Sequence, residues 1–238
     1  MAREGYVNLL PAQAKASANP GDSLEMLRAR REFLEAGHYA PLREAVVAML
    51  RPLGAGSLLD IGCGEGWYTS ALKSVAAEVA GLDIAKPAMQ MAAKRYKDIT
   101  WLVAIGTTLP LAAASADVVV NIFTQHHVGE IHRVLAPSGY ALVVSPAPAH
   151  LLSLRAALFD EVRAHEPGKF VEEFGALFAV EREEEVRFDL RLAQPALGQL
   201  LMMTPYAWKA RLEKRQALEA SAGLVTEAAF SLLLLRKN

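Results

Sequence analysis

From residue 57 onward, the chain alternates between short apolar runs and stretches whose apolar residues recur at helical spacing. The apolar runs predict strands at 57–62, 78–83, 99–104, 117–123 and 140–145. The stretches between them predict helices at 66–75, 86–95 and 127–135. Strands that are apolar on both faces and separated by helices indicate a mostly parallel, doubly wound sheet. We therefore expect an α/β fold with a ligand crevice beyond the carboxyl ends of the strands.

The segment before this core has a different pattern. Residues 1–21 form a polar lead without clear periodicity. Asp22, with Glu25 three residues later, predicts a capped helix that ends at Gly37, and Pro41 marks the start of a second helix. The predicted organisation is an N-terminal helical extension, residues 1–50, followed by one α/β domain, residues 51–238.

The segment after the core is also mixed. A long helix is expected after Pro148, to about Ala164. The charged run 181–185 leads into alternating apolar positions at 186–192, which predict an antiparallel strand on the edge of the sheet. A further helical stretch follows from residue 195, and residues 224–235 predict a final strand.

Composition narrows the class of protein. Hydrophobic residues make up 53% of the chain and charged residues 21%, enough apolar material for a substantial core. The apolar runs are far shorter than the roughly 20 residues that span a bilayer, so we expect a cytoplasmic protein without membrane segments. Cys63 is the only cysteine, which excludes an intrachain disulfide and a multi-cysteine zinc site. The formal net charge of -1 gives no global attraction to nucleic acid.

A glycine-rich turn follows the first predicted strand. Asp60 lies near the end of that strand, and Gly62, Gly64 and Gly66 follow it. Glycines allow a tight turn and a close approach of the backbone to a ligand. The last glycine of the dinucleotide fingerprint is replaced here by Trp67, and no Lys-Ser/Thr pair follows as in a phosphate-binding loop. The turn therefore favours a ligand of another kind.

Two acidic residues indicate which ligand. Asp60 suits an ammonium group near the turn, which a pyrophosphate does not. Asp83 ends the second predicted strand, where a carboxylate can accept hydrogen bonds from both hydroxyls of a ribose. The segment resembles the D-x-G-x-G-x-G signature of Rossmann-like class I methyltransferases, whose methyl donor is S-adenosyl-L-methionine. The alternative is a glycine turn that only packs against the sheet.

The flanks of the core carry a more specific resemblance. The segments concerned are 5–11, 19–23, 25–31, 33–39, 92–96, 148–151 and 203–210. The last of them has the sequence Met-Thr-Pro-Tyr-Ala-Trp-Lys-Ala. Together they resemble the bacterial 23S rRNA (guanine-N1)-methyltransferase family over nearly the whole chain. The resemblance implies methyl transfer to N1 of a guanine in large-subunit ribosomal RNA.

The resemblance also implies which residues surround the cofactor. Tyr39, Tyr68, Thr69 and His150 match family positions around S-adenosyl-L-methionine. The cofactor loop and the ribose-binding acid are matched by Asp60, Gly62, Gly64, Glu65 and Asp83. For Tyr39 and His150, the alternative is a core residue with a satisfied polar tip.

The sequence departs from the family in two places. The family begins with a small zinc-binding module of cysteines and a histidine, which has no counterpart here. We expect that module either upstream of Met1 or lost, and both interpretations stay open. The stretch 121–127 lacks the family's proline-containing pattern, in a loop that normally faces the acceptor base.

The reaction sets further requirements. Methyl transfer from a sulfonium is an in-line displacement that depends on positioning, and the proton on guanine N1 must leave. The sequence does not assign the catalytic base, and Asn121, His126 and His127 are candidates by location only. A metal bound with His132 is not expected, because no carboxylate–histidine helix pattern accompanies these histidines.

Basic side chains could contact phosphates, although a solvated helix face explains the same pattern. The candidates are Lys15, Arg28, Arg30, Arg31, Lys209, Arg211, Lys214 and Arg215. Two other functions stay open: a small-molecule methyltransferase, and a non-catalytic relative that binds the cofactor or RNA. The sequence leaves the oligomeric state open.

Overall fold

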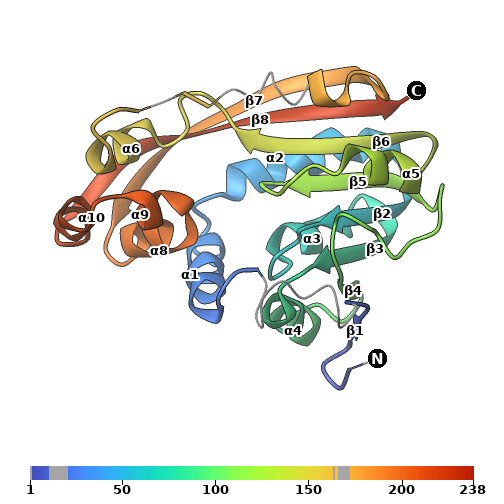
Figure 1. Cartoon of the computed structure of the whole chain (residues 1–238), viewed down its shortest axis with the longest axis horizontal. Coiled ribbons are helices and arrows are strands. Elements are labelled where there is room, and N and C mark those ends of the chain that lie inside the picture. The colour runs from blue at the N-terminus through green and yellow to red at the C-terminus, as the bar shows by residue number, and fades with distance from the viewer. Residues whose placement is uncertain (1, 11–20, 163, 166–171) are drawn as a thin grey trace.

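One mixed sheet forms the centre of the molecule, which a computed structural model describes for residues 2–10, 21–162, 164–165 and 172–238. Within these residues the strand order is β1-β4-β3-β2-β5-β6-β8-β7 (Figure 1). The bounds are β1 (Tyr6–Asn8), β2 (Ala55–Ile61), β3 (Ala76–Asp83), β4 (Thr100–Val103), β5 (Ala116–Ile122), β6 (Leu135–Pro146), β7 (Phe178–Ala193) and β8 (Gly223–Lys237). Strands β1 to β6 are parallel, whereas β8 runs antiparallel to β6 and β7. The predicted α/β class and antiparallel edge strand are confirmed.

The strand order reverses beside β2. Its neighbour on one side is β3, with Leu58 opposite Val79, and on the other side it is β5, with Leu58 opposite Val118. In an open parallel sheet, such a reversal leaves a crevice beyond the carboxyl ends of the strands. The glycine turn follows β2, so the topology places it at this crevice.

Helices cover the sheet and one of its ends. Their bounds are α1 (Leu24–Glu35), α2 (Ala40–Leu50), α3 (Trp67–Leu72), α4 (Lys86–Arg95), α5 (Val128–Val134), α6 (Leu152–Leu158), α8 (Ala196–Met203), α9 (Pro205–Lys209) and α10 (Leu212–Glu219). Helices α8, α9 and α10 gather at one end of the sheet, where α1 packs against α8 (Figure 1). None of the helices described is both long and apolar enough to cross a membrane.

The sheet divides the hydrophobic core into two layers. Successive residues of a strand point to opposite faces. Leu58 accordingly belongs to the layer that includes residues of α1 to α4, whereas Leu59 belongs to the layer under α5. Strand β8 alternates in the same way, with Leu232 in the first layer and Leu233 in the second. Burial on both faces explains why these strands are apolar at almost every position.

The N-terminal region corrects two predictions. Ser23, not Asp22, caps α1, because its side chain accepts a hydrogen bond from the amide of Met26 at 3.2 Å. Residues 6–8 of the supposed polar lead form β1, which pairs with β4 at the sheet edge. Three residues are too few to show a period, and their strand conformation depends on β4. Residues 11–20 of that lead lie outside the described residues.

The C-terminal region corrects two more. The helix expected to extend to about Ala164 ends at Leu158. The charged run 181–185, expected to precede a strand, lies inside β7. β7 is the outermost strand, and most of its first half is exposed, so charged side chains there remain in water. Pairing with β8, rather than apolar alternation, extends the strand over this run.

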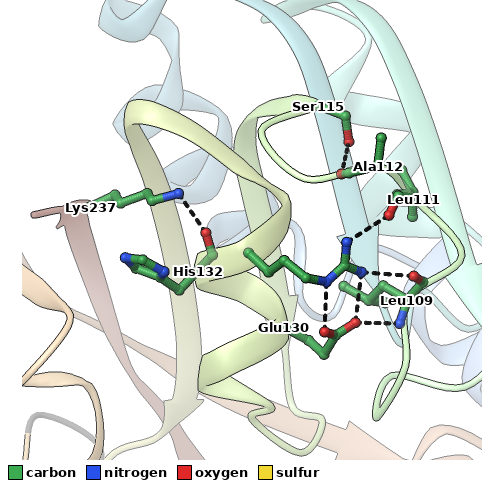
Figure 2. Close-up of polar contacts among 8 residues, drawn as sticks. Leu109, Leu111, Ala112, Ser115, Glu130, His132 and Lys237 are labelled. Carbon is green, nitrogen blue, oxygen red and sulfur yellow. Dashed lines mark hydrogen bonds and ion pairs between the residues drawn. The ribbon is translucent and has the colours of Figure 1, made fainter.

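A polar cluster holds the loop before β5 (Figure 2). The guanidinium of Arg133 on α5 donates to the carboxylate of Glu130 at 2.7 and 2.8 Å, and to the carbonyls of Leu109 and Leu111 at 2.9 and 2.8 Å. Glu130 also accepts from the amide of Leu109 at 2.6 Å. Lys237 of β8 donates to carbonyls at the end of α5. The cluster thus connects the loop, the helix and the last strand.

Trp101 of β4 fixes the spacing between the sheet and the glycine turn. Its side chain is 1% exposed, and its indole nitrogen donates to the carbonyl of Tyr96 at 2.8 Å. The ring lies directly over Gly81 of β3 and also against Gly66, so that a Cβ atom at either glycine would overlap it. The space that these glycines leave is filled by the indole.

We predict that Gly81→Ala destabilises the protein by about 2 kcal/mol, because overpacking a dense core forces neighbours to move. Gly129→Ala on α5 is the matched control, since a Cβ atom there meets nothing within 4 Å. That control is expected to be neutral or slightly stabilising, as alanine favours helix. Urea unfolding of both variants measures the difference, and equal stabilities would contradict the role assigned to Trp101.

Candidate active site

A cavity of about 1080 Å³ lies beyond the carboxyl ends of the central strands. The glycine turn and the end of β3 form one side of the cavity. Helix α1 adds Met26, Leu27, Arg30 and Leu34 to its lining. The loop after β5 and the segment from residue 203 to α9 form the other side. Its position is the one that the reversal of strand order predicts.

The glycine turn has a backbone that only glycine adopts freely. Gly62, Gly64 and Gly66 have φ angles of 71°, 56° and 83°. The amides of Gly62 and Cys63 both donate to the carbonyl of Leu82, at 2.7 and 3.1 Å. A Cβ atom on Gly62 would also meet Thr124, at 2.7 Å. The turn is therefore held against β3 and leaves its backbone open to the cavity.

Asp83 joins the end of β3 to this turn. One carboxylate oxygen accepts from the amide of Gly64 at 2.9 Å, and the other accepts from the amide of Ala85 at 2.8 Å. Burial raises the pKa of Asp83, and the two amide hydrogen bonds oppose that rise. The carboxylate lines the cavity, where its remaining lone pairs can accept from a pair of hydroxyl groups.

Asp60 lies at the bottom of the turn and is 2% exposed. Thr69 of α3 donates its hydroxyl to this carboxylate at 2.6 Å. Burial raises the pKa of Asp60 to about 7, although the bond from Thr69 lowers it. Asp60 lines the cavity, whereas Thr69 lies behind it and orients the acid.

Two buried polar atoms in the cavity wall have no hydrogen-bond partner among the described residues: Oε2 of Glu65 and the hydroxyl of Tyr68. Glu65 is 5% exposed, and burial raises the pKa of its carboxyl group. Such groups cost free energy when unpaired, so they indicate a bound polar ligand or water. Both residues line the cavity beside the glycine turn, where a polar ligand can pair with these atoms.

Arg30 brings a positive charge to this acidic side of the cavity. The sequence had left open whether Arg30 contacts phosphates or lies on a solvated helix face. Its guanidinium pairs with Asp22 at 2.5 Å and lies 3.4 Å from the position of a Cβ atom on Gly64. The neighbouring Arg28 and Arg31 do not line the cavity, and Arg31 pairs with Glu35 at 2.8 Å. Arg30 and Lys209 are the lysine and arginine residues that line the cavity within the described chain.

Tyr39 and His150 meet in an aromatic cluster at the far wall. Both lie within ring contact of Phe230, at 5.1 and 4.5 Å between centroids. His150 accepts from the amide of Ala229 at 3.3 Å, and burial lowers its pKa to about 3. His150 is therefore neutral at physiological pH. Both residues line the cavity and are also buried in the core. The structure is therefore compatible with both interpretations of the sequence, a position beside the cofactor and a position in the core.

The loop after β5 forms the side opposite Arg30. His126 and His127 line the cavity, and His126 approaches Glu173 at 3.8 Å. Burial lowers the pKa of His126. Asn121 is buried beneath the loop, where its amide donates to the carbonyl of Gln125 at 3.1 Å. The three candidates therefore differ in position: His126 and His127 reach the cavity, whereas Asn121 holds the loop from beneath.

The predicted basic residues of α10 and its N-terminus do not line the cavity. Arg211 and Lys214 both contact Asp160, at 3.7 and 2.6 Å, and Arg215 pairs with Glu219. Lys15 lies outside the described residues. In the part of the chain that the structure describes, no three histidine, cysteine or acidic side chains are grouped to hold a metal ion.

Known proteins resemble this chain in sequence and fold. Residues 59–143 match a family model described as a methyltransferase domain. A Streptomyces fradiae protein named 23S rRNA (guanine(748)-N(1))-methyltransferase is 37% identical over 216 residues, which cover 87% of this chain and 76% of the relative. The Bacillus subtilis protein YxjB, provisionally named for guanine-N(1) methylation of 23S rRNA, is 33% identical over 88% of this chain and 77% of its own.

A solved structure of an S-adenosylmethionine-dependent methyltransferase from Mesorhizobium loti has the same fold, with a TM-score of 0.52. It shares 19% identity and covers 85% of this chain and 99% of its own. Fold, glycine turn and family model together define a class I S-adenosyl-L-methionine-dependent methyltransferase. Within that class, the chain belongs to the 23S rRNA (guanine-N1)-methyltransferase family.

We predict a pH-dependent stability difference at Asp60. The ordinary pKa of this carboxyl is 3.8 and its value in the fold is about 7, so at intermediate pH the native state holds a proton that the unfolded chain has released. Stability therefore falls as pH rises between these values. Asp60→Asn removes this titration while keeping an acceptor for Thr69.

From pH 5 to pH 7, without cofactor, wild type should lose about 2 kcal/mol more unfolding free energy than Asp60→Asn. Urea unfolding at several pH values measures this difference. Glu65 and Asp83 titrate in both proteins, so their contributions cancel. Parallel pH profiles for the two proteins would show that Asp60 is ionised in the native state throughout.

Proposed function

We propose that this enzyme methylates N1 of a guanine in 23S ribosomal RNA, in the cytoplasm. The observation that carries the proposal is that one cavity is lined both by the glycine turn and by Thr204, Pro205, Tyr206, Trp208 and Lys209. The first group belongs to the methyltransferase domain, whereas the second belongs to a flanking motif of the rRNA enzymes. The named Streptomyces fradiae relative aligns over 87% of this chain, well beyond the 59–143 domain match.

The cofactor side is assigned residue by residue as part of this proposal. Asp83 accepts from the ribose hydroxyls, and the backbone of Gly62 and Gly64 lies against the amino-acid tail. Asp60, oriented by Thr69, faces the ammonium group, whose positive charge favours the ionised carboxylate. The orphaned Glu65 and Tyr68 atoms supply further polar contacts, and Tyr39 and His150 close the wall from the aromatic cluster.

Arg30 completes the tail site in this assignment. S-adenosyl-L-methionine carries a carboxylate, and an arginine guanidinium binds carboxylates through directed, charge-assisted hydrogen bonds. Arg30 lies beside Gly64 and is held by Asp22. Lys209, the other basic residue on the cavity wall, lies on α9 and so belongs to the acceptor side.

The acceptor side must position guanine and receive a proton. The bound cofactor supplies an electrophilic methyl group on a sulfonium, and the N1–C bond forms as the C–S bond breaks. The N1 proton leaves to a base or to water. His126 and His127 are the candidates because they line the cavity, and burial lowers the pKa of His126.

The proposal predicts N1-methylguanine in 23S rRNA transcribed in vitro and incubated with the enzyme and labelled cofactor. Nuclease digestion and mass spectrometry identify the modified base and its position. Asp83→Ala is expected to lower cofactor affinity at least tenfold and to reduce methylation, because the ribose hydroxyls lose a charged acceptor. Measurable cofactor binding by wild type without label in the RNA would refute the rRNA acceptor and favour a small molecule.

Arg30→Gln is predicted to weaken S-adenosylhomocysteine binding about tenfold, since a charged hydrogen bond to the carboxylate is lost. Decarboxylated S-adenosylmethionine is the diagnostic ligand, because its affinity should not change. Arg31→Gln is the matched control, as Arg31 pairs with Glu35 away from the turn. Isothermal titration calorimetry measures the affinity of wild type and both variants for each of the two ligands. An equal loss for both ligands would instead assign Arg30 the structural role of holding α1 through Asp22.

A further inference from the structure

Trp208 is exposed, unlike the other two tryptophans of the chain. Its side chain is 54% exposed, whereas Trp67 is 6% and Trp101 is 1% exposed. Large aromatic residues are highly buried on average, so an exposed indole calls for an explanation. Trp208 also lines the cavity that holds the glycine turn. An apolar ring at the mouth of a site, still open to water, is a surface for a ligand.

Contacts on two sides hold the segment that carries this indole. The guanidinium of Arg215 on α10 lies over the ring, 5.2 Å from its centroid, and pairs with Glu219 at 2.7 Å. Tyr206, two residues earlier on α9, shares a hydrogen bond of 2.8 Å with His165. The arginine leaves most of the ring uncovered, so a flat ligand can still stack on it.

We propose that Trp208 is a stacking platform for an unpaired base of the RNA substrate, next to the guanine that enters the cavity. This inference rests on the proposed function, because it requires an RNA acceptor. Sequence-specific RNA recognition targets bases that are splayed out and stacked on aromatic side chains. A guanine whose N1 is to be methylated must leave its pairing partner, which also exposes its neighbours.

The charge around Trp208 fits the same ligand. Lys209, the next residue along α9, lines the cavity and can approach a backbone phosphate beside the stacked base. The cation over the ring, Arg215, can extend the stacking surface, since guanidinium planes also stack on bases. Trp208 acts on the acceptor and takes no part in cofactor binding.

The first test compares variants in steady-state methylation of a 23S rRNA fragment centred on guanine 748, the position in the name of the Streptomyces fradiae relative. Trp208→Ala should raise KM for RNA about tenfold, since stacking one base on an aromatic ring is worth roughly that factor or more. Trp208→Tyr should recover most of this loss. Leu212→Ala, at a neighbouring residue that is 64% exposed, is the control and should behave as wild type.

The second test reads the contact directly. Stacking on the exposed indole should quench tryptophan emission when the same RNA fragment is added to wild type. Trp208→Tyr should abolish that quenching, because Trp67 and Trp101 remain buried. Affinity for S-adenosylhomocysteine should stay within twofold in every variant, which separates an acceptor contact from a general loss of structure.

The outcomes separate the two proposals. Methylation by wild type with an unchanged KM in Trp208→Ala, or quenching that persists in Trp208→Tyr, would overturn the stacking role and leave the rRNA function intact. A loss of cofactor affinity and thermal stability in Trp208→Ala would also overturn it, in favour of a packing role. Absence of methylation by wild type on any 23S rRNA would refute the function, and the stacking role with it.

Discussion

Two hydrogen bonds, from the amides of Gly62 and Cys63 to the carbonyl of Leu82, tie the glycine turn to β3. This connection sets the path of the chain between β2 and α3. It also places Asp83, the residue after Leu82, so that its carboxylate reaches back to the amide of Gly64 at 2.9 Å. The acid and the turn are therefore fixed relative to each other before any ligand binds. Such preorganisation reduces the ordering that binding must otherwise impose.

The same arrangement concentrates negative charge where water is scarce. Asp60, Glu65 and Asp83 are all shielded from solvent, and burial raises the pKa of each carboxyl group. Desolvated carboxylates are costly unless a positive charge compensates them. A ligand with a sulfonium and an ammonium group supplies that compensation. Arg30 moderates the cluster, and in the proposed function it also pairs with the carboxylate of the ligand.

The cavity thus has two parts, one shared with other methyltransferases of this fold and one proposed to bind the acceptor. The donor part comes from the glycine turn and β3, which belong to a fold shared with methyltransferases at 19% identity. Such a fold hosts many acceptors, so this part does not define a substrate. In the proposed function the acceptor part comes from the loop after β5, which lies inside the 59–143 domain match, and from α9, which lies outside it. The proposed rRNA specificity therefore rests on the loop after β5 together with the flanking α9.

The sequence predicted most of the sheet because burial on both faces leaves a strong apolar signal. The strand expected at 78–83 is β3 at 76–83, and the final strand expected at 224–235 is β8 at 223–237. Elements that depend on a neighbour could not be found in this way. β1 forms only against β4, and the first half of β7 forms only against β8. The spacing of apolar residues along the chain does not predict a strand that forms only by pairing with a neighbour.

The site was predictable where chemistry and strand ends coincide, as at Asp60 and Asp83. The sequence left open whether Arg30 contacts phosphates or lies on a solvated helix face. Its spacing nevertheless carried a signal for the cavity wall: it lies three residues after Leu27 and four before Leu34, both buried. Helical periodicity places it on the inner face of α1. The hydrogen bond from Thr69 to Asp60 and the orphaned atom of Tyr68 required coordinates, because no local spacing distinguishes them from packing.

The placement of β7 has a consequence for the chain during synthesis. β7 pairs only with β8 within the described sheet, yet α8, α9 and α10 come between them in the sequence. In a nascent chain, the residues of β7 therefore have no partner strand until β8 has emerged. Charged side chains on a strand edge disfavour pairing with another molecule. The charged run 181–185 in this outermost strand therefore disfavours edge-to-edge association of the folded protein.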